Sequence, residues 1–200
     1  MSTAPNMNNQ EQKNIIEAAL FVASEPLSVE KLRALFEGDA NQLSKADIQE
    51  CIDELKAEYN DNHGIYLQEV ASGYRFQTRE NTALYLHRLL EKKPARHSRA
   101  FLETLALIAY RQPISRGEIE AVRGVPVNSD MMRKLLEQDW IRMVGRRDVP
   151  GKPALFGTTQ KFLDDFNLKK LDDLPPLKVI LDFENMDSLI SQQISLPIES

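Results

Sequence analysis

The feature that most constrains this 200-residue chain is an internal repeat. Residues separated by 86 or 87 positions are identical or chemically similar along much of its length. The matched pairs are Glu17 and Glu103, Pro26 and Pro113, Ser28 and Ser115, Leu32 and Ile119, Leu35 and Val122, and Gly38 and Gly124. A fixed period of this kind indicates one structural unit built twice. We therefore expect two compact domains, which a chain of this length can accommodate.

Each copy of the repeat predicts helices first and strands afterwards. In the first copy, apolar residues recur at helical spacing, and Ser28 and Ser44 stand where N-caps are favoured. After Gly64 the pattern becomes that of two strands around the turn Ala71-Ser72-Gly73. The elements expected here are helices over 14–24, 28–38, 44–59 and 81–90, and strands over 65–70 and 74–78.

The second copy repeats this order. Ser115 and Glu118 form a capping box, and the helix that they open stops at Gly124. The elements expected here are helices over 98–110, 115–124, 128–139 and 161–166, and strands over 141–146 and 154–158. Three helices followed by a two-stranded ribbon, twice over, predict two tandem winged helix-turn-helix domains. This fold is mainly α with small β wings (α+β), and each wing must pack on its own helices because an isolated hairpin is only marginally stable.

The chain is expected to divide into five parts. They are a disordered N-terminal tail (1–13), a first winged-helix domain (14–90), a linker (91–97), a second winged-helix domain (98–170) and an acidic C-terminal tail (171–200). The start of the chain is rich in Asn and Gln, which argues against a signal peptide or anchor. The longest apolar run, Phe101 to Tyr110, is about half of a membrane span. Since the single cysteine, Cys51, excludes an internal disulfide, we expect a cytoplasmic protein.

The formal net charge of −5 hides a strong division along the chain. Residues 1–90 carry −6, residues 91–170 carry +6, and residues 171–200 carry −5. Reading DNA in the major groove requires a third helix with donors for bases and cations for phosphates. In the first domain that helix carries five acids, Asp47, Glu50, Asp53, Glu54 and Glu58, and only two bases, Lys45 and Lys56. The corresponding helix of the second domain carries −1, so neither helix is expected to read sequence.

Positive charge collects instead on the second wing and its flanks. The residues that could contact a DNA backbone are Arg142, Arg146, Arg147 and Lys152, opposed only by Asp148. A solvated basic hairpin, or a docking patch for an acidic partner, explains the same residues and is favoured. The alternative function is a winged-helix DNA-binding protein or transcriptional regulator that contacts DNA through this wing.

No pattern in the chain predicts an enzyme. The histidines, His63, His87 and His97, lack the spacing of metal ligands, and there is no nucleophile with a base and no phosphate-binding loop. Cys51 falls on the apolar stripe of its helix and is expected in the core. We therefore expect no catalytic residue, no cofactor and no metal.

Several motifs make the chain recognisable. In the second half they include Glu103 to Tyr110, Gln112 to Arg116, Trp140-Ile141, Asp148 to Pro153, Gly157 to Thr159 and Leu171 to Pro176. In the first half they are Ile15 to Phe21 and Ser24 to Leu27. Over residues 14–176 the chain resembles the segregation and condensation protein B (ScpB) family, an accessory subunit of the bacterial SMC condensin.

The resemblance implies partners rather than a reaction. It implies a homodimer formed through the N-terminal domains, binding to the kleisin ScpA, and a link through the kleisin to the SMC ATPase. The complex supports chromosome condensation and segregation during cell division, in the cytoplasm at the nucleoid. Candidates for the dimer interface are Ile65, Leu67, Tyr74 and Phe76, and the alternative for each of them is a place in the core under the first wing. Candidates for kleisin binding are Tyr110, Ile114, Arg116, Trp140 and Arg142.

Overall fold

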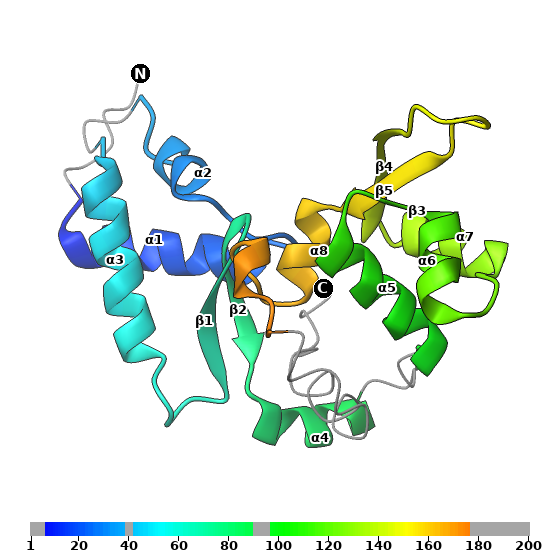
Figure 1. Ribbon diagram of the computed structural model, residues 1–200. Coiled ribbons are helices and arrows are strands. Elements are labelled where there is room, and N and C mark those ends of the chain that lie inside the picture. Colours follow the sequence, from blue (N-terminus) through cyan, green and yellow to red (C-terminus); the bar gives the residue numbers. More distant parts are fainter. Residues whose placement is uncertain (1–6, 39–41, 90–96, 177–200) are drawn as a thin grey trace.

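The computed structural model describes residues 7–38, 42–89 and 97–176, in two halves that follow one another in sequence (Figure 1). The first half contains α1 (Asn9–Val22), α2 (Val29–Ala34), α3 (Lys45–Glu58), β1 (Ile65–Val70), β2 (Gly73–Thr78) and α4 (Glu80–Leu89). The second half contains α5 (Arg99–Arg111), β3 (Ile114–Ser115), α6 (Arg116–Arg123), α7 (Ser129–Glu137), β4 (Ile141–Arg146), β5 (Ala154–Thr158), α8 (Gln160–Asp165) and the 3-10 helix η1 (Leu171–Asp173). Helices are thus combined with small antiparallel sheets, an α+β fold.

Each half is built around its own hydrophobic core. Leu32 and Ile119, which the repeat matches, are both fully buried, one in each core. Their helices begin in the same way, because Ser28 caps α2 and Ser115 caps α6. The order and the capping of the helices therefore follow the repeat.

The sheets extend the parallel between the halves. We call β1, β2 and their turn the first hairpin, and β4, β5 and residues 147–153 the second hairpin. In the second half, β3 adds a short strand to β5, with Ile114 opposite Phe156. In the first half, Leu27 forms an isolated bridge with Tyr74, in which each N–H donates to the other's carbonyl at 2.9 Å. The sequence did not predict β3, because two residues are too few to show an alternating pattern.

Two of the predicted boundaries, at residues 13 and 170, differ from the structure. The expected tail over 1–13 is wrong in its last part, since α1 begins at Asn9, where Asn8 and Glu11 form a capping box. After residue 170, η1 follows and Leu174 packs against the second core, so the second half extends beyond its expected end. The predicted tail from residue 177 and most of the predicted linker lie outside the described residues. Within the described ranges, no helix is both long and apolar enough to cross a membrane.

Candidate interaction surfaces

The second hairpin projects from the second half (Figure 1). It also exposes apolar side chains. Met143 and Val144 on β4 are 54% and 46% exposed, and Val149 in the turn is also exposed. The strand order β3-β5-β4 makes β4 an edge strand, so one side of its backbone has no neighbouring strand in the sheet. An edge strand with exposed apolar residues is suited to receiving an extended segment.

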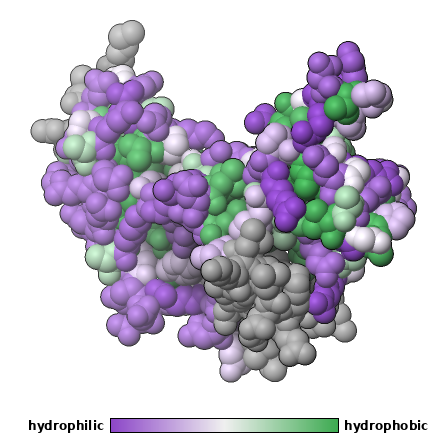
Figure 2. Space-filling model, in the orientation of Figure 1, coloured by the Kyte–Doolittle hydropathy of each residue, from purple (hydrophilic) through white to green (hydrophobic). Residues whose placement is uncertain are grey.

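The cations predicted to lie on this hairpin are there, but they differ in their surroundings. Arg142 and Arg146 are exposed, and Arg146 donates to the carbonyl of Lys152 at 3.2 Å. Arg147 forms an ion pair with Glu118 of α6 at 2.9 Å. Hydrogen bonds from Ser115 chiefly, together with Arg147, hold the pKa of Glu118 below its usual value. Figure 2 shows hydrophilic and hydrophobic residues side by side on this projection.

Ile114, Trp140 and Tyr110, three other kleisin candidates, make contacts inside the second half. Ile114 is buried in the second core, and Trp140, also buried, donates from Nε1 to Asp165 at 2.7 Å. Tyr110 donates from its hydroxyl to the carbonyl of Pro175 at 2.5 Å, and burial raises the pKa of its phenol. Arg142, by contrast, is exposed to solvent on the projecting second hairpin.

Arg116 holds the connection between α6 and α7. Its guanidinium donates to the carbonyl of Val127, to Ser129 Oγ at 3.1 Å and to Glu120 at 3.0 Å. The side chain of the same Val127 is fully buried. Arg116 therefore orders a corner of the fold, which gives it a role independent of any partner.

The dimer candidates on the first hairpin lie mostly inside the first half. Leu67, Tyr74 and Phe76 are 6–7% exposed within a single chain, and Ile65 packs against the same core. The hairpin covers α1 and α3 with these side chains, which matches the alternative that the sequence left open. These side chains therefore offer little exposed apolar surface to a second copy.

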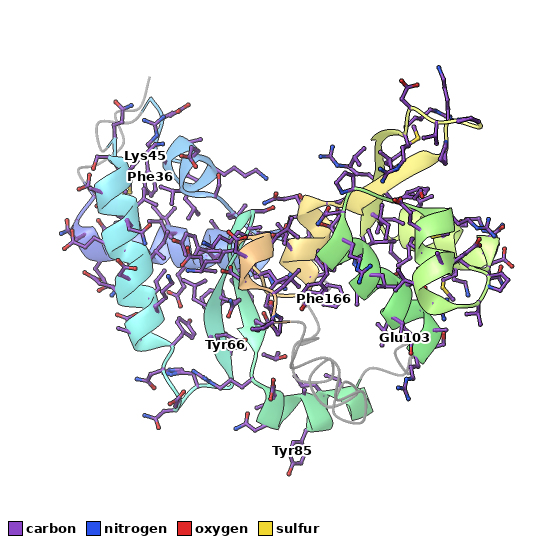
Figure 3. The ribbon with its side chains drawn as sticks, in the orientation of Figure 1. Phe36, Lys45, Tyr66, Tyr85, Glu103 and Phe166 are labelled. Atoms are coloured by element: carbon purple, nitrogen blue, oxygen red, sulfur yellow. The ribbon has the colours of Figure 1, made fainter. Side chains whose placement is uncertain are left out.

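The outer side of α1 offers such a surface. Ile15, Ala18, Phe21 and Val22 are all exposed, and Phe21 and Val22 are 67% and 74% exposed. Their spacing places them along one side of the helix. We call these four residues the α1 apolar face. On α4, Tyr85 and Leu89 are exposed as well, and Figure 3 shows Tyr85 pointing away from the body of the protein.

The third helix of the first half remains acidic in the folded chain. Lys13 of α1 is 6% exposed and pairs with Glu58 and, at 3.1 Å, with Glu54. These carboxylates raise the pKa of Lys13. Because this cation lies on α1 beneath α3, it holds the two helices together and presents no positive charge to a nucleic acid.

His63, His97 and Cys51 pack against neighbouring side chains. His97 stacks on Phe101, with 4.6 Å between the ring centroids, and burial lowers the pKa of its imidazole. His63 packs against Tyr59. Cys51 is buried on the inner side of α3, as expected, and this burial raises the pKa of its thiol. Among the described residues no cluster of three or more His, Cys, Asp or Glu side chains could hold a metal ion.

Comparison with known proteins identifies close relatives. Residues 14–177 match the family described as Segregation and condensation complex subunit ScpB. The Segregation and condensation protein B homolog of Coxiella burnetii is 56% identical over 193 residues, which is 96% of this chain and 91% of the relative. The Segregation and condensation protein B of Desulforamulus reducens is 45% identical over 170 residues, 84% of this chain and 91% of the relative.

Solved structures give matches of the same name. The crystal structure of ScpB from Mycobacterium tuberculosis is 33% identical and covers 80% of this chain and 96% of that chain, with a TM-score of 0.39. A dimer of an ScpB N-terminal domain complexed with an ScpA peptide is 29% identical and covers 40% of this chain and 95% of that chain, with a TM-score of 0.36.

Proposed function

The chain belongs to the segregation and condensation protein B (ScpB) family, and from this membership we propose that it is a non-enzymatic subunit of a bacterial SMC–kleisin condensin. In this role a homodimer binds the kleisin ScpA, and the kleisin links it to the SMC ATPase. The complex condenses and segregates the chromosome in the cytoplasm. The family match over residues 14–177 is the observation that carries the proposal. We propose further that each half is a winged helix-turn-helix unit used for protein contacts.

The second hairpin supports binding of an extended segment. Its edge strand offers backbone groups for pairing, its apolar side chains offer contact area, and Arg142 and Arg146 favour acidic residues in the partner. A purely electrostatic DNA contact would not need Met143 and Val144 at the surface. We therefore assign this hairpin to the kleisin, through a segment that carries both apolar and acidic residues.

Reversing the charge of Arg142 should weaken kleisin binding. We expect the Arg142→Glu variant to bind ScpA about tenfold more weakly, because one charge-assisted contact is replaced by repulsion. Calorimetric titration with purified ScpA measures the change. Arg133→Glu on α7 is the matched control, since Arg133 is exposed and its ion pairs with described residues are local, with Asp130 and Glu137. Equal affinities for the two variants would overturn the assignment of the hairpin.

The α1 apolar face is the proposed contact between two copies. An exposed apolar stripe of this kind is typical of protein interfaces. We expect Phe21→Asp to convert the homodimer to a monomer at micromolar concentration, measured by light scattering during gel filtration. Leu89→Asp on α4 introduces the same charge at a similarly exposed site and should leave the dimer intact. A dimeric Phe21→Asp variant together with a monomeric Leu89→Asp variant would move the interface to α4.

Direct DNA binding is the second candidate function, and the exposed Arg142 and Arg146 favour it. It predicts that the purified protein binds duplex DNA, that binding weakens steeply between about 50 and 200 mM salt, and that it falls when Arg146 and Arg147 are neutralised. The ion pair between Arg147 and Glu118 already reduces the available positive charge. Preference for one short operator would indicate a regulator instead of a condensin subunit.

A further inference from the structure

The turn of the first hairpin contacts the second half of the chain. The backbone N–H of Ser72 donates to Asp164 Oδ1 at 2.8 Å, and the Ser72 hydroxyl donates to Asp164 Oδ2 at 2.6 Å. The neighbouring N–H of Ala71 donates to the carbonyl of Leu168 at 2.9 Å. Both oxygens of one carboxylate on α8 are therefore bound by a turn about 90 residues away in sequence.

A second contact comes from the following strand. Arg75 Nη2 donates to the carbonyl of Asp164 at 2.8 Å and to Asn167 Oδ1 at 2.9 Å. The last carbonyls of a helix have no partner within it, and a cation there satisfies them. Arg75 is 9% exposed and Asp164 is 8% exposed, so these polar groups are removed from water. Hydrogen bonds offset part of the cost of burying these charged groups, and Arg75 Nε is buried without a hydrogen-bond partner among the described residues.

A third contact lies at the edge of this region. Lys169 Nζ binds Glu69 Oε2 of β1 at 2.7 Å, and the same Glu69 oxygen accepts from Lys56 of α3 at 3.2 Å. These two cations hold the pKa of Glu69 low against its partial burial. Figure 1 shows the first hairpin beside α8 and the segment that follows it. Three kinds of contact thus join the first hairpin to residues 164–169, the end of α8 and the segment after it.

The equivalent turn of the second half behaves differently. Residues 147–153 extend away from the fold and expose Val149, while the first hairpin turns inward. The repeat therefore uses one hairpin at the surface and the other between its two halves. Nothing in the repeat itself requires this difference, since the residues that create it, Ser72, Arg75 and Asp164, are not among the matched pairs.

We propose that the first hairpin is an intramolecular docking element, with Asp164 as its receptor, and that it fixes the second half relative to the first. The chain then behaves as one rigid unit instead of two domains on a tether. The α1 apolar face, proposed to contact a second copy, and the second hairpin, proposed to contact the kleisin, are then held at a set separation, so less conformational freedom is lost when the complex assembles. The first hairpin is correspondingly occupied and is not a surface for DNA or for a partner.

Amide hydrogen exchange on the full-length protein tests this proposal. The N–H groups of Ala71 and Ser72 should be protected in the natural sequence. In Asp164→Ala the Ser72 N–H should exchange at least about tenfold faster, because its hydrogen bond to a charged acceptor is lost. The Ala71 N–H should also exchange faster, because the turn that holds it against the Leu168 carbonyl loses its anchor. The amides of Tyr66 and Gln77, which lie opposite each other at a hydrogen-bonded position of the β1–β2 ladder, should keep their protection and report that the first half is folded.

The control is Asp172→Ala, which removes the same charge from η1, the element that follows α8. The Asp172 side chain is 85% exposed and, within the described ranges, pairs only with Lys170 at 3.7 Å, so this variant should exchange like the natural sequence. If Asp164→Ala does not fold, Ser72→Ala removes one donor from the exposed end of the contact and should give a smaller acceleration at Ala71. Unprotected Ala71 and Ser72 amides in the natural sequence would overturn the proposal, as would unchanged protection in Asp164→Ala.

Discussion

Replacing Trp140 by alanine should lower the free energy of unfolding of the second half by about 3–5 kcal/mol, the usual loss for a buried aromatic residue. The indole is 9% exposed and packs between three aromatic rings. Its ring centroid lies 5.2 Å from that of His97, 6.2 Å from that of Phe101 and 5.1 Å from that of Phe166. The substitution also leaves Asp165 without the indole N–H that donates to it.

Denaturant unfolding followed by far-ultraviolet circular dichroism measures this loss. The chain has one tryptophan, so its fluorescence follows the second half in the natural sequence but is absent from the variant. Trp140→Phe is the control, because it keeps a ring in the cluster and loses mainly the hydrogen bond, for about 1 kcal/mol. A Trp140→Ala variant of normal stability that no longer binds the kleisin would instead make this residue an interface anchor.

Gly73→Ala should destabilise the first half by at least about 1–3 kcal/mol, the cost of holding a residue with a side chain in a conformation suited to glycine. Gly73 has φ of 138° at the start of β2. An added Cβ would lie 2.2 Å from the carbonyl oxygen of Leu27 and 2.6 Å from the nitrogen of Ser28. Both are backbone atoms, next to the bridge that joins Leu27 to Tyr74, so the clash cannot be relieved by rotating a side chain.

The midpoint and slope of denaturant unfolding measure the Gly73→Ala effect. Gly145→Ala on β4 is the matched control, since its added Cβ would meet nothing within 4 Å. We expect Gly145→Ala to change the free energy of unfolding by less than about 1 kcal/mol. Equal stability of the two variants would show that the contact between the hairpin and Leu27 is not needed for folding. The Gly73→Ala variant should also speed up amide hydrogen exchange at Ser72. A shift of the β2 backbone at Gly73 displaces the adjoining turn from Asp164.

The order of elements could be predicted from the sequence because its signals are local. Ser28, Ser44 and Ser115 each accept from a backbone N–H at the start of a helix, as their positions indicated. The strands of both hairpins were also expected. The early start of α1 was missed because the cap at Asn8 lies in a polar stretch without an apolar stripe.

Candidate sites were predicted less well, because chemical type does not say which way a residue faces. Leu67, Tyr74 and Trp140 are of residue types common at protein interfaces, but they are buried within one chain. Phe21 and Val22 are of residue types common in cores, but they are exposed. Both kinds of position lie on regular, apolar-rich elements, so only the packing of one element on another separates them.

The sequence by itself determined that a unit of helices and a hairpin occurs twice, that its third helices carry net negative charge, and that it resembles a condensin subunit. These conclusions rest on spacing, capping and charge, which are properties of neighbouring residues. Only the tertiary structure decided that the two hairpins differ in use. The bonds from Ser72 and Arg75 to Asp164 and Asn167 join residues about 90 positions apart. Such a contact depends on how two folded halves meet, which no local pattern records.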